Sequence, residues 1–299
     1  MTERERGMDI VRFKGGLGNQ MFQYAFIEAL RSRGRCVMAS IGGYAKNPKA
    51  REFSICNVFT NINLGFVSDA IFDEIDEKWK KIKQDEVEKQ LFCNNYEERF
   101  FWVEDVVKEP GVYHPNVFST KNCTFVGYWQ SEKYFKDVRK LLLTKFTFTK
   151  IVPDLEKFAD MLENNGYVSV HIRRGDYLSN QDVYMGVCTR EYYLKAIEYI
   201  ENKNHNTKLI FFSDDMVWVK ENLKVPNALY FDKGRFTNYA DWYDMYLMSR
   251  CRHNIIANST FSWWGAWLNQ NENKIVVAPR RWHKNNTTPD IWCEEWVRL

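Results

Sequence analysis

Apolar residues in the second half of the chain gather in short runs rich in β-branched and aromatic side chains, separated by longer stretches with a helical period. Such runs predict buried strands, and they lie at 167–172, 208–212, 228–231, 253–257 and 274–278. The stretches with a helical period predict helices at 189–202, 214–223, 238–250 and 259–270. Strands that alternate with helices at this spacing are typical of a parallel sheet covered by helices on both faces.

The first half opens with one unit of the same kind. An apolar run at 9–13 predicts a strand, a glycine-rich turn follows, and 20–33 has the period of a helix. Farther along, we expect a helix at 68–91 and a strand with its loop at 125–130, whereas most of 60–110 has no readable period.

These patterns predict the fold class α/β, with two Rossmann-like domains. The N-terminal domain is expected at 1–150 and the C-terminal domain at 151–299, joined by a linker at 149–154. A length of 299 residues suits two domains of medium size.

Composition narrows the range of ligands. Charged residues make up 27% of the chain but nearly cancel to a net charge of +3, so nucleic acid is not expected as a partner. A local basic pocket for a small anion remains compatible with that balance. Aromatic residues make up 16%, which builds solid cores and also suits sugar recognition, because flat rings stack on pyranose C–H groups.

Cysteine usage and the N-terminal residues indicate a compartment. The seven cysteines form no CxxC pair, so we expect a reduced protein without a disulfide framework or zinc site. Residues 1–7 are charged and no apolar run follows them, so no signal peptide is expected. No apolar run reaches the length of a membrane span. The expected location is the cytoplasm, with peripheral attachment to a membrane as the alternative.

The end of the strand at 167–172 carries the strongest chemical signal. Arg173 and Arg174 follow it directly, and Asp176 comes two residues later. Two adjacent guanidinium groups are costly to desolvate, and their planar forks match phosphate oxygens. They predict a site for a dianion. The alternative is that both arginines pair with carboxylates at the edge of the core, such as Asp176.

The turn at 15–20 has the sequence GGLGNQ between a strand and a helix. Glycines let a phosphate or a sugar approach backbone N–H groups at the positive end of a helix. The segment is not a P-loop, because GK[ST] is missing, and Met21 replaces the last glycine of GxGxxG. The alternative is a structural tight turn.

Two further loops follow predicted strands. Ser213, Asp214 and Asp215 follow the strand at 208–212, where one residue, Ser213 or Asp214, is expected to cap the next helix. The other acid could accept hydrogen bonds from a ribose or from the N1–H and N2–H pair of guanine. The segment 258–267 opens a helix with hydroxyls and free N–H groups that suit an anion. Its alternative is a Ser259 cap followed by a tryptophan stripe that packs in the core.

Together these segments resemble glycosyltransferase family 11, the α1,2-fucosyltransferases. The resemblance rests on GGLGNQMFQYAF (15–26), HIRRGDY (171–177), FFSDD (211–215) and NSTFSWWGAWL (258–268). HxRRxD is shared with α1,6- and protein O-fucosyltransferases, whereas the last segment is more particular to family 11. Residues 40–120 match no motif that we can name.

The resemblance implies a GT-B fold with a cleft between its two domains, GDP-fucose as the donor substrate, inversion at the anomeric carbon, and no metal or other cofactor. It implies that 1–150 serves the acceptor and 151–299 binds GDP-fucose. The reaction would be transfer to the 2-hydroxyl of a terminal galactose on an oligosaccharide or lipid-linked glycan in a bacterial cytoplasm. The alternatives are an α1,6-fucosyltransferase of the nodulation type and a non-catalytic module that binds a glycan or nucleotide.

The family's donor-binding roles carry over by position. Arg173 resembles the arginine on the β-phosphate, and Arg174 supports it or reaches the second phosphate oxygen. His171 and one of the acids Asp214 and Asp215 resemble the guanine contacts. The hydroxyl and N–H clamp on the diphosphate is expected at Ser259, Thr260 and Ser262.

The remaining predicted site residues concern the acceptor and the proton. Gly16, Gly18 and Asn19 match the N-terminal loop that faces the donor. Asp176 is the first candidate for the base that deprotonates the galactose 2-hydroxyl. One alternative is that Asp176 orients the arginines, and another is that it has no part in the mechanism, which would turn attention to Asn19.

Overall fold

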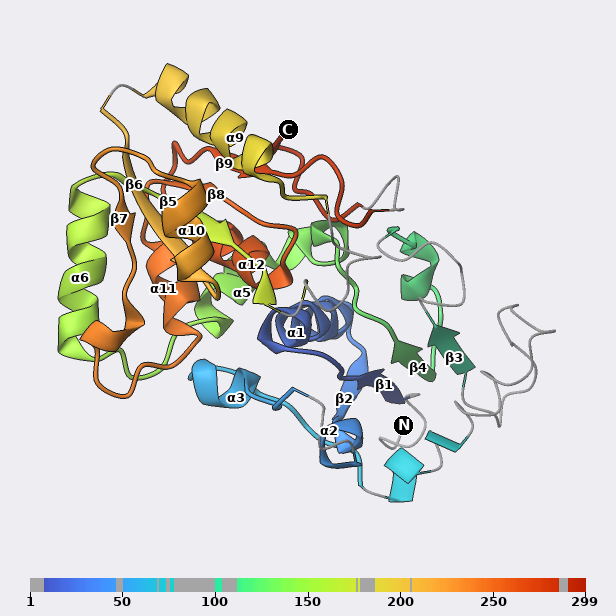
Figure 1. The fold of residues 1–299 in the computed structure, drawn as a ribbon. Helices are drawn as coiled ribbons and strands as arrows, with labels where there is room; N and C mark the ends of the chain where they lie inside the picture. Colours follow the sequence, from blue (N-terminus) through green and yellow to red (C-terminus); the bar gives the residue numbers. More distant parts are fainter. Residues whose placement is uncertain are drawn as a thin grey trace. The chain divides into compact units, whose positions relative to one another are not determined.

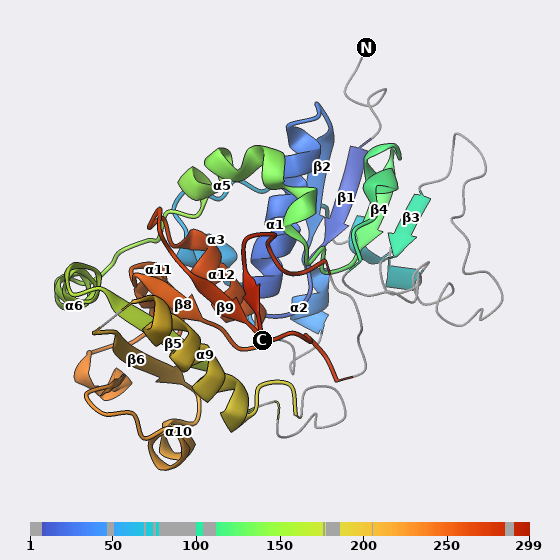
Figure 2. The same cartoon turned by 90° about the horizontal axis from the view of Figure 1, so that it is seen from above.

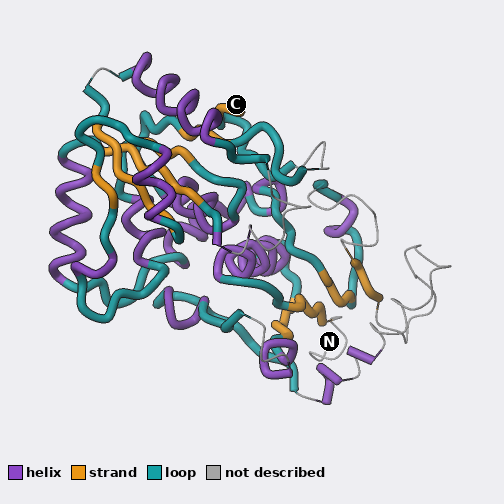
Figure 3. Tube along the Cα trace, in the orientation of Figure 1, coloured by secondary structure: helices purple, strands orange, loops and turns teal. Residues whose placement is uncertain are grey.

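A computed structural model describes residues 8–46, 51–68, 70–73, 76–77, 100–103, 112–175, 177, 186–204, 206–284 and 290–299. The chain divides into two compact units, and each holds one parallel sheet with its helices (Figures 1 and 3). The N-terminal unit is Met1–Thr147 with Pro289–Ile291, and the C-terminal unit is Phe148–Thr288 with Trp292–Leu299. Two parallel α/β units confirm the predicted class and are the pair from which a GT-B fold is built.

The sheet of the N-terminal unit has the order β2-β1-β4-β3, and every pairing is parallel. Its strands are β1 (Met8–Arg12), β2 (Cys36–Ser40), β3 (Phe100–Val103) and β4 (Cys123–Val126). Its helices are α1 (Leu17–Arg31), α2 (Gly42–Lys46), α3 (Ile55–Val58), η2 (Pro115–Phe118), η3 (Glu132–Tyr134), η4 (Lys136–Val138) and α5 (Arg139–Lys145).

Helix α1 is the centre of this unit. Residues 20–30 are buried without interruption, so α1 is packed on all sides rather than along one stripe. Phe26 stacks on Trp129 with ring centroids 4.3 Å apart. This packing fixes α1 against the loop after β4, and so it places the two loops that follow β1 and β4.

The sheet of the C-terminal unit has the order β10-β9-β8-β5-β6-β7, again with parallel pairings (Figure 2). Its strands are β5 (Tyr167–Ile172), β6 (Lys208–Ser213), β7 (Leu229–Tyr230), β8 (His253–Ile255), β9 (Val276–Ala278) and β10 (Val297–Arg298). Its helices are α6 (Pro153–Asn164), α9 (Arg190–Lys203), α10 (Met216–Asn222), η5 (Lys233–Arg235), α11 (Tyr243–Ser249) and α12 (Thr260–Leu268).

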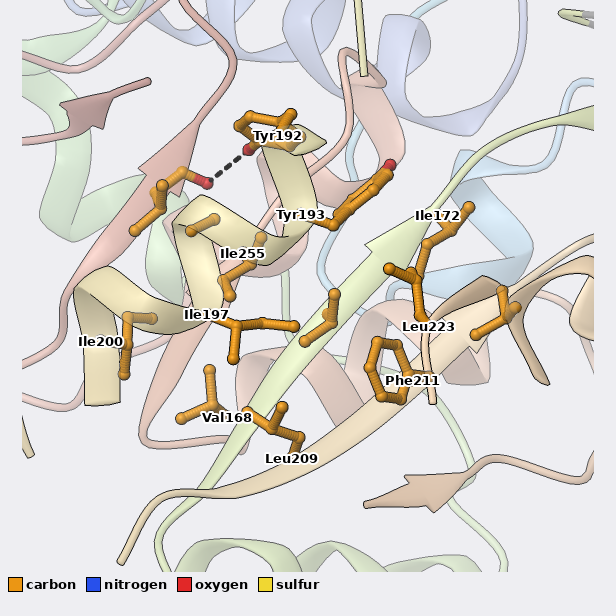
Figure 4. Close-up of a cluster of buried hydrophobic side chains, with 14 residues drawn as sticks. Val168, Ile172, Tyr192, Tyr193, Ile197, Ile200, Leu209, Phe211, Leu223 and Ile255 are labelled. Atoms are coloured by element: carbon orange, nitrogen blue, oxygen red, sulfur yellow. Dashed lines mark hydrogen bonds between the residues drawn. The ribbon is translucent and has the colours of Figure 1, made fainter. Parts of the chain in front are cut away.

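The core of the C-terminal unit lies between this sheet and α9 (Figure 4). Val168 and Phe211 from the sheet pack with Ile197 and Ile200 from the helix. Tyr192 is buried there too, and its hydroxyl donates to the carbonyl of Ile256 at 2.7 Å and to that of Val277 at 3.2 Å. These bonds tie α9 to the ends of two strands, which stiffens the sheet that carries the site.

The structure corrects several expected elements. The helix expected at 238–250 forms only from Tyr243, because Asn238 has a left-handed backbone with φ of 54°. Helix α6 was not expected, and it starts at Pro153, inside the expected linker. Of the helix expected at 68–91, the structure describes 68, 70–73 and 76–77, with the last two ranges helical. No described helix is long and apolar enough to span a bilayer.

Candidate functional site

The carboxyl ends of β8, β5 and β6 lie side by side, because these strands are parallel neighbours in the C-terminal sheet. Ligands of open α/β sheets bind at this kind of edge. The loops that follow the three strands carry the segments 256–260, 173–177 and 213–215. The structure therefore brings three of the four predicted segments to one edge.

Arg173 is held by a carboxylate from the neighbouring loop. Its Nη1 lies 3.0 Å from Oδ2 of Asp214. Asp214 also accepts from the backbone N–H groups of Arg174 at 2.9 Å and of Gly175 at 3.0 Å. A Cβ at Gly175 would lie 2.8 Å from Oδ2 of Asp214, so the glycine allows the carboxylate to approach. Asp214 thus fixes both the guanidinium of Arg173 and the turn that carries it.

Arg174 is held by the next acid. Its Nε lies 3.0 Å from Oδ2 of Asp215, and its guanidinium lies over the ring of Trp218, 4.1 Å from the centroid. Asp215 is also the N-cap of α10, since it accepts from the backbone N–H of Trp218 at 3.1 Å. One of the two acids was expected to cap this helix, and Asp215 does; the cap is not Ser213 or Asp214, because Asp214 is engaged by the loop after β5.

These ion pairs leave the arginines accessible. The side chains of Arg173 and Arg174 are 25% and 26% exposed, so each is half-buried in a fixed orientation. A guanidinium has several N–H donors in a fork, and one carboxylate does not use all of them. The alternative from the sequence, pairing with carboxylates, therefore describes how the arginines are oriented, with Asp214 and Asp215 as the partners.

His171 is buried at the end of β5. Burial, together with the nearby cations Arg173 and Lys233, lowers its pKa from 6.5 to about 3, so the ring is neutral at physiological pH. Within the described part of the chain, its Nδ1 has no hydrogen-bond partner. Its ring lies 6.0 Å from that of Phe261, in the first turn of α12. A buried, neutral imidazole nitrogen without a partner suits a ligand that hydrogen-bonds to it.

The start of α12 shows what each predicted hydroxyl does. Ser259 is the N-cap and accepts from the backbone N–H of Phe261 at 3.3 Å. The hydroxyl of Ser262 is buried and reaches the carbonyls of Ala257 at 3.4 Å and of Ser259 at 3.2 Å, so it faces its own loop. Thr260 is half-buried, and no described residue uses its hydroxyl. The three tryptophans of this helix are buried, as expected: Trp263, Trp264 and Trp267.

Tyr177 connects two of the loops at this edge. Sequence reasoning did not predict this role. Its hydroxyl donates to the carbonyl of Asn258 at 2.7 Å. The Asn258 side chain is buried, donates to the carbonyl of Trp282 at 2.9 Å and lies 3.4 Å from the thiol of Cys188. The tyrosine stands inside HIRRGDY, so its place in the motif was the available signal.

Lys233, the first residue of η5, adds another cation, and sequence reasoning missed it because no motif surrounds it. Its Nζ lies 3.0 Å from buried Asp244 and 3.3 Å from Asp241. Asp244 also accepts from the hydroxyl of Tyr239 at 2.5 Å. Its charge is one of the causes that lower the pKa of His171.

Asp176, the predicted base, lies outside the described residues. The fourth segment, 15–20, lies in the N-terminal unit after β1. Gly16 is the N-cap of α1, and buried Gly18 stands in its first turn. Gly15 has φ of 82°, and a Cβ there would lie 2.5 Å from Nδ2 of Asn19. The turn therefore depends on glycine to accommodate Asn19.

Two buried glutamines hold this turn. Both stand in the motif, but sequence reasoning did not assign them this role. Gln20 donates to the carbonyls of Gly15 and Glu52 and accepts from the backbone N–H groups of Ser54 and Ile55. Gln23 accepts from the backbone of Lys14 and donates to two carbonyls, Lys14 and Gly127. Both the Nε2 and the Oε1 atom of Gln20 are thus hydrogen-bonded to backbone groups.

The model of the family described as "Glycosyl transferase family 11" matches residues 1–299. The chain belongs to glycosyl transferase family 11. This confirms the resemblance that the sequence motifs indicated, and it makes the chain a glycosyltransferase.

Two bacterial relatives of this family 11 protein are named as glycosyl-group transferases. It is 33% identical to an alpha-1,2-colitosyltransferase of Escherichia coli, over 97% of this chain and 98% of the relative. It is 32% identical to the O-antigen biosynthesis glycosyltransferase WbnK of Escherichia coli, over 95% and 98%. Among solved structures, fucosyltransferase NodZ from Bradyrhizobium aligns at 15% identity and a TM-score of 0.49, over 87% of this chain and 92% of that one. That structural likeness is too weak to carry a conclusion.

Proposed function

We propose that this enzyme transfers L-fucose from GDP-fucose to the 2-hydroxyl of a terminal galactose, with inversion and without a metal ion. The observation that carries the proposal is the arginine pair at the end of β5, oriented by Asp214 and Asp215 beside the N-terminus of α12. The acceptor is an oligosaccharide or a lipid-linked glycan, met in the cytoplasm or at its membrane surface.

The chemistry follows from the charge of the leaving group. When the bond to fucose breaks, negative charge grows on the diphosphate, and preorganised cations and N–H donors stabilise it. Arg173 and Arg174 supply the cations, and the first turn of α12 with Thr260 supplies N–H and hydroxyl donors. Asp214 and Asp215 already orient the arginines, so little reorganisation of the site is needed as the charge on the diphosphate grows.

The base and the nucleobase contacts have separate candidates. His171 offers its buried imidazole nitrogen to guanine, which agrees with its lack of a partner among the described residues. Both Asp214 and Asp215 hold arginines, which favours an orienting role for them over reading of guanine. Asp176 remains the proposed base for the galactose 2-hydroxyl, and Asn19 the alternative.

A second donor is worth testing. The relative at 33% identity is named an alpha-1,2-colitosyltransferase, and colitose lacks the 3-hydroxyl of fucose. The deciding experiment offers GDP-fucose and GDP-colitose with a panel of galactose-terminated acceptors and reads the products by mass and linkage analysis. We expect fucose on O2 of galactose. Fucose on O6 would support the nodulation-type alternative, and preferred use of GDP-colitose would replace the proposed donor.

Release of fucose from GDP-fucose without an acceptor separates an enzyme from a binding module. A transferase is expected to hydrolyse the donor slowly, because water replaces the acceptor. A non-catalytic module would bind GDP and release no fucose, and that result would overturn the proposal.

We expect turnover to survive EDTA. The sequence has no DxD motif, and the paired arginines with the α12 N-terminus supply the charge that a cation would otherwise provide. The measurement compares initial rates before and after dialysis against EDTA. Loss of turnover that Mg²⁺ or Mn²⁺ restores would contradict the metal-free mechanism.

A further inference from the structure

The N-terminal sheet has its own polar edge, where two side-chain amides meet. Asn19 lies in the first turn of α1, after β1, and Gln130 lies in the loop after β4. Strands β1 and β4 are parallel neighbours, so both loops leave the same edge of the sheet. The Nε2 of Gln130 donates to Oδ1 of Asn19 at 2.8 Å.

Each amide of this pair has one polar atom that can still form hydrogen bonds with a ligand. Both side chains are half-buried, and within the described residues no group bonds Nδ2 of Asn19 or Oε1 of Gln130. The pair therefore presents a donor and an acceptor next to each other. Neighbouring hydroxyls of a sugar ring each donate and accept, so they match such a pair.

In the loop after β4, a buried tryptophan separates two half-buried residues, Tyr128 and Gln130. Trp129 has a left-handed backbone with φ of 56°, which is a genuine outlier for a bulky residue. Its fully buried indole stacks on Phe26 and keeps it there. The flanking residues Tyr128 and Gln130 stay half-buried at the edge, and the ammonium of Lys14 lies 4.0 Å from the centroid of the Tyr128 ring.

We propose that Asn19, Gln130 and Tyr128 form a subsite for an uncharged hexopyranose of the acceptor, an inference that rests on the proposed transferase function. The two amides bind a pair of adjacent hydroxyls, and the ring of Tyr128 packs against the C–H face of the same sugar. Lys14 engages one face of that ring, which fixes the ring plane.

The first test measures acceptor and donor separately. Gln130→Ala is expected to raise the acceptor KM at least about tenfold, since each bond to a hydroxyl contributes of the order of a tenfold effect, while GDP affinity by calorimetry stays that of the unmodified protein. Asn116→Ala is the matched control, because Asn116 is an exposed amide of the same unit, on η2. An unchanged acceptor KM in Gln130→Ala, or a parallel loss of GDP affinity, would overturn the subsite.

The second test separates ring stacking from general damage to the loop. Tyr128→Ala is expected to raise the acceptor KM by about tenfold, whereas Tyr128→Phe keeps the ring and is expected to restore most of the affinity. Equal losses in both variants would contradict a stacking role for the ring.

Binding of methyl β-galactoside in the presence of GDP, followed by NMR saturation transfer, gives a readout that needs no turnover. If the unmodified protein binds the galactoside through Gln130 but transfers no sugar, the subsite stands and the proposed function fails. If sugar transfer is normal and Gln130→Ala binds the galactoside as well as the unmodified protein, the function stands and the subsite is wrong.

Discussion

The two sheets of this enzyme have the same parallel architecture, but their carboxyl edges are held together in opposite ways. At the edge of the C-terminal sheet, charged side chains orient one another: Arg173 with Asp214, and Arg174 with Asp215. At the edge of the N-terminal sheet, Arg12 pairs with Asp76 at the end of β1, but the turn that follows is held by neutral amides, with Gln20 bonded to four backbone groups. The same fold unit therefore supports one set of loops oriented by ion pairs and one turn held mainly by neutral amides.

The difference follows from what each edge is proposed to bind. Two neighbouring guanidinium groups repel each other when no diphosphate is bound. A carboxylate beside each guanidinium reduces this repulsion and fixes the orientation of the guanidinium. A sugar hydroxyl needs no charge, only donors and acceptors at set positions, and buried amides bonded to backbone hold such positions without a net charge. Substitutions that remove a charge therefore test the edge of the C-terminal sheet, and substitutions that remove a side-chain amide test the edge of the N-terminal sheet.

The largest effect is expected at the ionic edge. Arg173→Ala should lower turnover by about 10³-fold, because the lost cation stabilises charge that grows in the transition state, and it should weaken GDP binding as well. Arg252→Ala is the matched control, since Arg252 is exposed and precedes β8 at the opposite edge of the sheet. Intact GDP affinity and turnover in Arg173→Ala would remove Arg173 from the phosphate site.

The two acids should respond unequally to the loss of charge. Asp214→Asn should weaken GDP and ADP binding alike, by about tenfold to a hundredfold, because Asp214 holds Arg173 and two backbone N–H groups. Asp215→Asn should cost less, since asparagine caps helices nearly as well as aspartate. Calorimetry with both nucleotides measures this. A loss of the preference for GDP over ADP in one variant only would instead show that this acid reads the base.

At the neutral edge, the corresponding test is one of stability. Gln20→Ala should lower the free energy of unfolding by about 3 kcal/mol, because it removes four hydrogen bonds to backbone groups, one of them buried and three partly buried. Urea unfolding measures the change, and exposed Gln270→Ala serves as the control, expected within about 0.5 kcal/mol. A similar stability for Gln20→Ala would mean that water replaces the amide and that the turn is not held as described.

The smallest expected effect concerns pH. The pKa of His171 falls from 6.5 unfolded to about 3 folded, so the unfolded state binds more protons between these values. Stability is therefore complete above pH 6.5 and falls as the pH drops towards 3, by roughly 2 kcal/mol at pH 5. His253, with a pKa lowered to about 4, adds a loss of the same sign.

Replacing the histidine tests this assignment. His171→Asn should reduce the loss of stability between pH 7 and pH 5, read from urea midpoints at both values. His253→Asn provides the comparison, because it removes another histidine whose pKa is lowered and leaves His171 in place. A pH dependence that His171→Asn leaves unchanged would show that His171 is not the buried neutral group described.

The sequence by itself predicted most strands and helices of the C-terminal unit, although not α6 and β10, and it identified the four segments that carry chemistry. Strands such as 167–172 are runs of apolar residues that no helix period fits, and strand ends in a parallel sheet share an edge. That rule predicts that the loops after 167–172 and 208–212 share one edge, but the carboxylate that the sequence suggested as a partner for the arginines was Asp176. Residue type and local spacing carry this information, because they act within a few residues of each other.

Only the tertiary structure decided which partner each side chain takes. Asp215 rather than Asp214 caps α10, because Asp214 is drawn to backbone N–H groups forty residues earlier in the chain. Ser262 donates its hydroxyl to a carbonyl of its own loop, Lys233 pairs with Asp244, and Gln130 donates to Asn19 across 111 positions. Such contacts depend on packing between distant segments, and the local pattern of a sequence does not encode which distant groups will meet.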